Sequence, residues 1–111
     1  MEIKLANNFK NRLLGLMFKK KFNYGLLIKV KGNLKINSSI HSCFMRRAIE
    51  VYFIDKNNIV YEKIVLKPWN FHTPSKKAKY ILETPIDFIN LKKGEKVNLE
   101  NLIHQKDFQQ L

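Results

Sequence analysis

The sequence predicts an α+β fold that is predominantly β. Short apolar runs bounded by turn residues recur between residues 24 and 99, which is typical of strands, whereas residues 8–18 carry apolar side chains at helical spacing. The chain has 111 residues, 45% of them hydrophobic, with 4 Gly and 3 Pro, which is enough for one compact core. We therefore expect a single domain over residues 1–111, with residues 100–111 as a loosely docked helix or a frayed tail.

The N-terminal segment is expected to form an amphipathic helix of about three turns. Asn7 or Asn8 can cap it, because an Asn side chain accepts a hydrogen bond from the free amides of the first turn. Gly15 lowers the helix propensity and suggests that another backbone packs closely there. The apolar positions share one face: Phe9, Leu13, Leu16 and Met17.

The first strand is predicted over residues 24–30, an apolar run that ends at a turn over residues 31–33. Residues 34–36 could return beside it as the second strand of a hairpin.

The strongest hairpin signal covers residues 49–66. Residues 49–54 and 59–66 read as its strands, and Asp55 is expected to open the turn between them by bonding nearby backbone amides. Three residues of its first strand are expected to point into the core: Ile49, Val51 and Phe53.

The C-terminal half is expected to alternate loops with short strands. Residues 67–75 read as a loop, because two prolines and small polar residues interrupt both periodicities. A strand is expected over residues 78–83 and should stop at Pro85. Residues 86–91 are then expected to make a helical turn, and residues 97–99 a last short strand.

The composition indicates a basic protein. The formal net charge of +12 would attract phosphates or other anions, although a lysine-rich solvated surface explains the charge equally well. We find no apolar run long enough for a membrane-spanning helix and no signal peptide, so we expect a cytoplasmic protein. The single Cys43 cannot form an intrachain disulfide, and we expect neither a metal site nor a cofactor.

His41, Cys43 and Met45 form the first candidate constellation. Their spacing would place all three side chains on one face of a strand, where imidazole, thiolate and thioether could bind a soft metal or another ligand. Cys and Met are more often ordinary core residues, however, and a His at the rim of a core is usually hydrogen-bonded. The structural interpretation is therefore favoured.

Glu50 is the most interesting carboxylate. It falls between the core-facing residues of its strand, so it is either solvated or buried beside a basic group such as Arg12, Arg46 or Arg47. Paired with His41, either Glu50 or Glu83 could do general acid/base work. A structural ion pair would satisfy a buried carboxylate equally well.

A third constellation lies in the loop that begins at residue 67. Trp69, Phe71 and His72 could stack nucleic-acid bases while neighbouring ammonium groups meet phosphates. The lysines concerned are Lys67, Lys76, Lys77 and Lys79. The chain has no recognised RNA-binding signature, and a lone Trp beside a proline more often clamps a loop onto the core.

Five short blocks, in this order, resemble the domain of unknown function 192 family over residues 8–99. They are Arg12 with Gly15-Leu16-Met17-Phe18, then His41 and Met45, then residues 49–55, then residues 80–83, and finally Gly94-Glu95. The chain departs from the family where Ala48-Ile49-Glu50 replaces the usual Pro-Leu-Asp or Pro-Ile-Asp, which lengthens the carboxylate by one methylene. The resemblance implies a small prokaryotic domain with a mostly antiparallel, barrel-like sheet and the early helix packed against it. It implies no activity, so catalytic residues stay unknown.

We therefore expect an uncharacterised small domain that binds a small molecule or a peptide as an accessory module. The candidate ligand-binding residues are His41, Met45, Arg46, Glu50 and Trp69. Two alternatives remain open, namely an enzyme that uses His41 with Glu50 or Glu83 and a basic nucleic-acid-binding domain. A pocket that joined His41 to Glu50 would favour the enzyme, and a positive stripe with exposed aromatics would favour nucleic acid.

Overall fold

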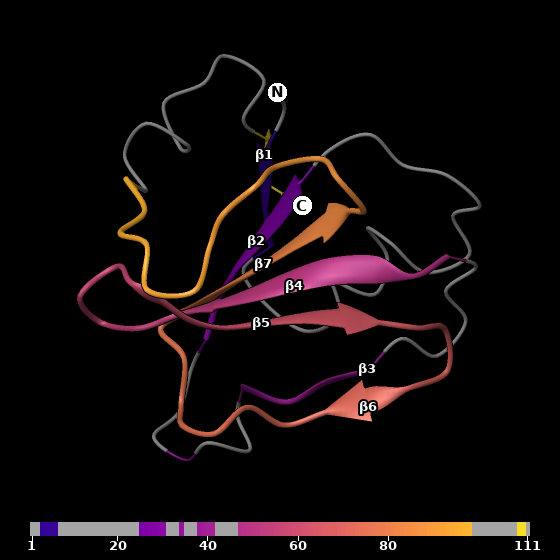
Figure 1. Ribbon diagram of the computed structural model, residues 1–111, viewed down its shortest axis with the longest axis horizontal. Helices are drawn as coiled ribbons and strands as arrows, with labels where there is room; N and C mark the ends of the chain where they lie inside the picture. The colour runs from indigo at the N-terminus through magenta and orange to yellow at the C-terminus, as the bar shows by residue number, and fades with distance from the viewer. Residues whose placement is uncertain are drawn as a thin grey trace.

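The computed structural model describes residues 3–6, 25–30, 34, 38–41, 47–98 and 109–110. These residues form β-strands and contain no helix (Figure 1). The strands are β1 (Ile3–Ala6), β2 (Gly25–Lys29), β3 (Ile40–His41), β4 (Ile49–Ile54), β5 (Val60–Leu66), β6 (Phe71–His72), β7 (Tyr80–Pro85) and β8 (Gln109–Gln110). The prediction of a predominantly β domain is confirmed, and the helix expected over residues 8–18 lies outside the described residues.

The strands make one large sheet and one small ribbon. The sheet has the order β5-β4-β7-β2-β1-β8, and β3 and β6 pair separately. β1 runs parallel to both of its neighbours, and every other pair is antiparallel. Within the described residues the outer strands β5 and β8 do not pair with each other, so the sheet is open and the expected barrel is wrong.

Both faces of the sheet are covered at β4, and all six residues of β4 are buried. Figure 1 shows the β3-β6 ribbon on one side of β4 and the segment that follows β7 on the other. The ribbon-side core consists of Leu26, Ile28, Val30, Ile40, Ile49, Val51, Phe53, Leu66, Ala78 and Ile81. The loop-side core consists of Leu27, Tyr52, Ile54, Val60, Leu82, Leu91 and Val97.

The β4-β5 hairpin is confirmed. Phe53 lies opposite Glu62, and the register then shifts, so that Ile54 lies opposite Val60. The carboxylate of Asp55 accepts hydrogen bonds from the amides of Asn57 and Ile59, at 2.8 and 3.0 Å. The sequence predicts this turn correctly because an Asp side chain can replace the missing backbone acceptors of a tight connection.

Three other expectations are corrected. The hairpin between residues 24–30 and 34–36 is wrong, because β7 and β1 occupy the two edges of β2. Phe71 and His72 form β6 inside the expected loop, because β3 supplies their partners. Residues 86–91 make a tight turn, in which Asp87 has a φ of 62°, followed by residues without regular secondary structure, instead of a helical turn.

Two further expectations are met in part. The strand expected over residues 78–83 is confirmed with later bounds, and it ends at Pro85. Near the expected last strand, the described residues contain only an isolated bridge between Ile59 and Lys96. β1 has no counterpart among the strands predicted from the sequence.

We predict that Phe53→Ala lowers the free energy of unfolding by about 3–5 kcal/mol, as truncation of a buried Phe usually does. Phe53 is fully buried in the ribbon-side core and lies near the rings of Tyr61 and His72. Urea unfolding followed by circular dichroism measures the loss. Val65→Ala is the control, because Val65 lies on β5 with 56% of its surface exposed. Equal losses in the two variants would contradict the assigned strand facing.

Candidate functional site

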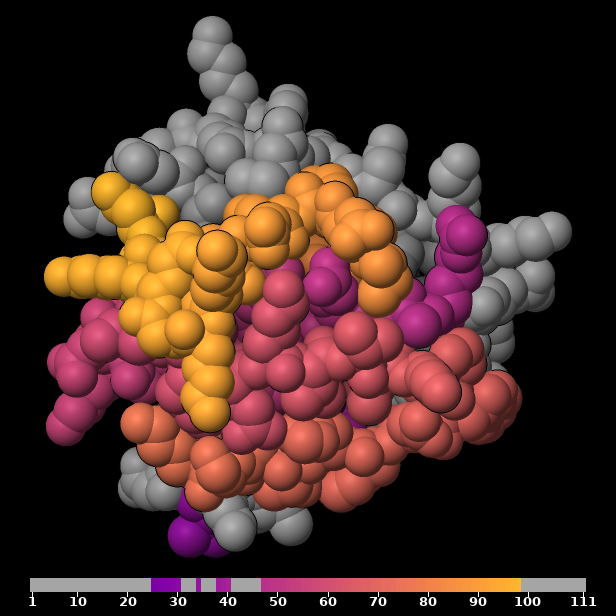
Figure 2. Space-filling model, in the orientation of Figure 1, coloured from indigo at the N-terminus to yellow at the C-terminus, as the bar shows by residue number. Residues whose placement is uncertain are grey.

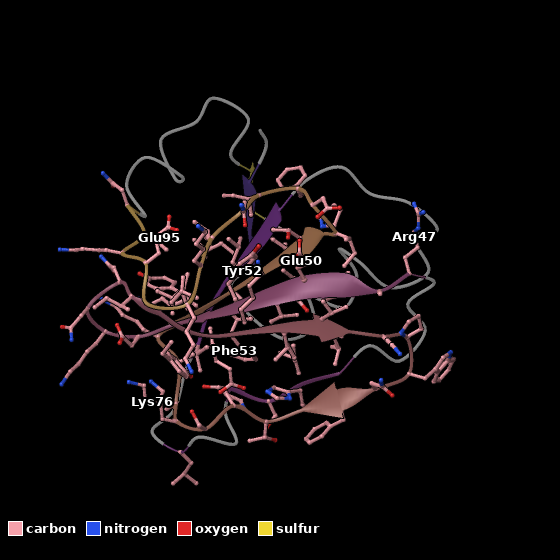
Figure 3. All side chains as sticks on the ribbon, in the orientation of Figure 1. Arg47, Glu50, Tyr52, Phe53, Lys76 and Glu95 are labelled. Carbon is pink, nitrogen blue, oxygen red and sulfur yellow. The ribbon has the colours of Figure 1, made fainter. Side chains whose placement is uncertain are left out.

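Two of the candidate ligand-binding residues, His41 and Glu50, lie on different strands and on opposite sides of β4. His41 belongs to β3, where it pairs with Phe71 on the ribbon side of β4. Glu50 instead shares the opposite face of β4 with Tyr52, as Figure 3 shows. Trp69 lies in the β5-β6 connection and is 61% exposed. Met45 and Arg46 lie outside the described residues.

Glu50 is buried and fastens the segment that follows β7. One carboxylate oxygen accepts a hydrogen bond of 2.8 Å from the amide of Asp87. The other lies 3.6 Å from the ammonium group of Lys63. Of the two alternatives for Glu50, the observed contacts match the buried ion pair, and the basic partner is Lys63 on β5.

Tyr52 extends this network. Its hydroxyl donates a hydrogen bond of 2.8 Å to the carbonyl of Ile89, and the Lys63 ammonium lies 5.1 Å from its ring centroid. Burial, followed by the nearby charge of Glu50, raises the pKa of Tyr52, so the hydroxyl stays protonated and remains a donor. Desolvation would lower the pKa of Lys63, but Tyr52 and Glu50 outweigh it and raise that pKa. Glu50, Tyr52 and Lys63 together hold residues 87–89 over the sheet.

Two more buried polar residues lie on β7 beside this network. Thr84 pairs across the strands with Glu50, and its hydroxyl is buried without a hydrogen-bond partner among the residues that the structure describes. Glu83 is fully buried and pairs with Val51, so its side chain belongs to the ribbon side. Glu83 and Glu50 therefore lie on opposite faces and cannot form one carboxylate site.

The described residues do contain one contact between a His and a carboxylate. The Nε2 atom of His72 on β6 lies 2.5 Å from Oε2 of Glu62 on β5. The other oxygen of Glu62 accepts a hydrogen bond of 3.0 Å from the amide of Ser75. Burial would raise the pKa of Glu62, but the bonds from Ser75 and His72 outweigh it and lower that pKa. This pair ties the ribbon to the edge of the main sheet.

A groove of about 550 Å³ lies between the β4-β5 turn and the segment that precedes β7. We call it the lysine groove; it is lined by Asp55, Lys56, Asn57, Lys76, Lys77, Ala78 and Lys79. Figure 3 shows Lys76 on the same side of the molecule as this turn. Four ammonium groups against one carboxylate give the groove a positive balance, which favours anions.

The groove has a fixed frame. The amide of Lys79 donates a hydrogen bond of 2.8 Å to the carbonyl of Ile54, and the Val30 amide donates one of 3.0 Å to the carbonyl of Lys79. The Tyr61 hydroxyl donates to the carbonyl of Lys76 at 2.5 Å. Burial is the main cause that raises the pKa of Tyr61, so this donor stays protonated. The lysines therefore project from backbone that is held at both walls.

Asp55 is already engaged at one wall of the groove. Its carboxylate holds the turn and also lies 3.7 Å from the Lys76 ammonium, which in turn lies 4.7 Å from the Tyr61 ring centroid. Burial would raise the pKa of Asp55, but hydrogen bonds from Ile59 and Asn57 and the charge of Lys76 lower it. A ligand thus meets an acidic group whose charge is largely compensated by its neighbours.

The sequence predicts only part of the groove lining. Lys76, Lys77 and Lys79 are close together in the chain and form a basic cluster, whereas Lys56 comes from a separate segment. Only the antiparallel pairing of β4 with β7 brings the turn and the later segment together.

Among the described residues no three His, Cys, Asp or Glu side chains are gathered as a metal site, and no helix is long and apolar enough to cross a membrane.

These features define a small, mostly antiparallel β domain with a basic groove between the β4-β5 turn and the segment before β7. The chain belongs to the DUF192 family, described as "Uncharacterized ACR", whose model matches residues 1–99. The resemblance noted in the sequence is thereby confirmed.

Two archaeal relatives illustrate the family. A UPF0127 protein of Pyrococcus furiosus is 40% identical over 106 residues, covering 93% of this chain and 90% of the relative. A UPF0127 protein of Pyrococcus horikoshii is 43% identical over 84 residues, covering 76% of this chain and 72% of the relative. These relatives carry no described activity in their names.

A crystal structure of a protein of unknown function from Novosphingobium aromaticivorans has the same fold. The TM-score is 0.70 at 15% sequence identity, and the match covers 86% of this chain and 73% of that one. At this identity the likeness concerns the fold alone.

We predict that Glu50→Ala lowers the free energy of unfolding by about 1–3 kcal/mol, because it removes the charged acceptor of the part-buried hydrogen bond from the Asp87 amide. Glu50→Gln keeps a carbonyl oxygen for that amide and should recover part of the loss. Urea unfolding measures both variants, and hydrogen exchange at the Asp87 amide locates the change. Parent-like unfolding of the alanine variant would contradict the fastening role of Glu50.

We also predict a specific acid sensitivity. Because the folded pKa of Glu62 lies below its ordinary value of 4.5, its stabilising contribution is present above that value and is lost as the pH falls through the folded pKa. In Glu62→Gln, unfolding free energy should therefore fall less than in the parent between about pH 5 and about pH 3. Urea titrations at several pH values provide the comparison. Parallel pH profiles would exclude this contribution.

Proposed function

We propose that this domain is a binding module that takes a small anionic ligand in the lysine groove. The observation that carries the proposal is the groove itself, in which four lysines from two separate chain segments surround about 550 Å³. A pocket of this size is typical of small-molecule sites. The net charge of +12 adds a long-range field that attracts anions toward it.

The chemistry of the lining favours binding over catalysis. The groove is lined by Lys, Asp, Asn and Ala residues and by no His, Cys, Ser or Thr. Its Asp55 carboxylate is hydrogen-bonded to the turn, so it is a poor candidate for a proton acceptor toward a ligand. Lysine ammonium groups bind phosphate as point charges, which suits recognition without a reaction.

We assign the ligand to the lysine groove in preference to the face around Glu50. Glu50 already binds the Asp87 amide and Lys63, and Tyr52 binds the carbonyl of Ile89. These contacts support a structural role for Glu50. In the groove, Lys76 pairs with Asp55 and Lys79 lies over the Tyr80 ring, whereas Lys56 and Lys77 add two further ammonium groups that can converge on a ligand.

We predict that inorganic pyrophosphate binds the parent protein and that the double variant Lys56→Gln/Lys77→Gln binds it about tenfold more weakly, which corresponds to about 1.4 kcal/mol. The two lysines stand on opposite walls of the groove, and neither forms the ion pair with Asp55. Isothermal titration calorimetry measures the affinity at fixed ionic strength.

Lys92→Gln/Lys93→Gln is the matched control, because both lysines are exposed and lie outside the groove. It removes the same charge and should bind within about twofold of the parent. Equal weakening in the two double variants would mean that the overall field attracts pyrophosphate without a site. Absence of binding to the parent would overturn the proposed function.

A further inference from the structure

An exposed aromatic pair lies on the same chain segment as three groove lysines. Trp69 is 61% exposed and Phe71 is 67% exposed, although large aromatic side chains are usually buried. Trp69 has a φ of 64°, a left-handed backbone conformation that bulky residues rarely adopt. The side chains of Trp69 and Phe71 are therefore both largely exposed to solvent.

The charge around this pair has one sign. Residues 67–79 contain four lysines and no Asp or Glu. Two carboxylates from outside the segment contact it: Glu62, which is occupied by His72 and the Ser75 amide, and Asp55, which lies 3.7 Å from the Lys76 ammonium. A partner that lies along residues 67–79 thus meets aromatic rings and ammonium groups without an opposing free carboxylate from the segment itself.

The geometry joins the two features into one surface. Figure 1 shows the β5-β6 connection at one end of the molecule and the segment before β7 at the other, beside the β4-β5 turn. In Figure 2 the colours of residues 60–80 run across the lower part of the face in view, between these two ends. The backbone from Trp69 to Lys76 spans at most about 25 Å, a distance that a few nucleotides can follow.

We propose that the anion held by the lysine groove is the phosphate backbone of single-stranded nucleic acid, whose bases stack on Trp69 and Phe71. This inference rests on the proposed anion-binding function and names its ligand. Stacking requires single strands, because the faces of paired bases are covered by their neighbours, and it tolerates any sequence because every base has a flat π-face. An acidic peptide would use the lysines but would have no use for the exposed rings.

The test uses a fluorescein-labelled oligothymidylate of about ten nucleotides and the full chain. Fluorescence anisotropy gives the affinity, and the intrinsic fluorescence of Trp69, the single Trp of the chain, reports contact directly. We expect the Trp69 emission to be quenched on binding. Trp69→Leu and Phe71→Ala should each weaken binding about tenfold. Ile86→Ala, an exposed apolar residue on the other side of the sheet, should bind like the parent.

The salt dependence tests the role of the groove. Each phosphate neutralised on a single strand contributes about 0.7 to the slope of log affinity against log salt concentration. Lys56→Gln/Lys77→Gln should therefore reduce the slope by about 1.4, and Lys92→Gln/Lys93→Gln should leave it unchanged. An unchanged slope in the groove variant would overturn the inference.

The remaining outcomes separate this inference from the proposed function. If pyrophosphate binds in the groove but the oligothymidylate does not bind, the nucleic-acid inference fails and the proposed function stands. If neither binds, both fail. Equal affinity for duplex DNA or for polyglutamate, or an oligothymidylate complex without Trp69 quenching, would also overturn the stacking mode. Unchanged pyrophosphate binding by Phe71→Ala shows that this variant is folded.

Discussion

The burial of β4 on both faces is the constraint on which the rest of the structure depends. A polar group on a strand that is covered on both sides is removed from water, so it needs a partner within the protein. Glu50 nevertheless occupies the second position of β4, and it is buried. The fold satisfies this carboxylate with Lys63 from β5 and the Asp87 amide from the segment after β7. The other residues of β4 alternate between the two cores, with Ile49, Val51 and Phe53 on the ribbon side and Tyr52 and Ile54 on the loop side.

The lysine groove is a consequence of the same strand. The turn that follows β4 forms one wall, and the amide of Lys79 is bonded to the carbonyl of Ile54 at the end of β4. The opposite wall is fixed by Tyr61, whose hydroxyl holds the backbone at Lys76. The charged side chains are thereby carried on backbone that is held by hydrogen bonds, and this reduces the ordering cost of binding.

The local parts of the fold could be predicted from the sequence. Alternation along residues 49–54 and the turn chemistry of Asp55 predicted the hairpin and the buried positions of Ile49, Val51 and Phe53. The reason is that each signal acts between residues close in the chain. Glu50 could be assigned to the opposite face, but its partner Lys63 could not be chosen before the register was known.

The non-local parts could not be predicted in the same way. β1 and β6 are short and have no pattern of their own, and they are strands because β2 and β3 supply hydrogen bonds. The partner of β2 was wrong because the sequence favoured the nearest apolar segment, whereas β7 pairs with it from far along the chain. The groove could be predicted only in part for the same reason, because Lys56 and Lys77 come to line one groove only through the pairing of β4 with β7.

The placement of β1 between β2 and β8 has a consequence for how the domain forms. Lys4 lies opposite Gln109, so residues near the two ends of the sequence are adjacent in the sheet. Contacts between distant residues close large loops, and a topology rich in them folds slowly. During synthesis, the outer strand β8 cannot pair with β1 until residues 109–110 have left the ribosome. Until then β1 presents an unpaired edge, which makes the nascent chain open to pairing with other strands.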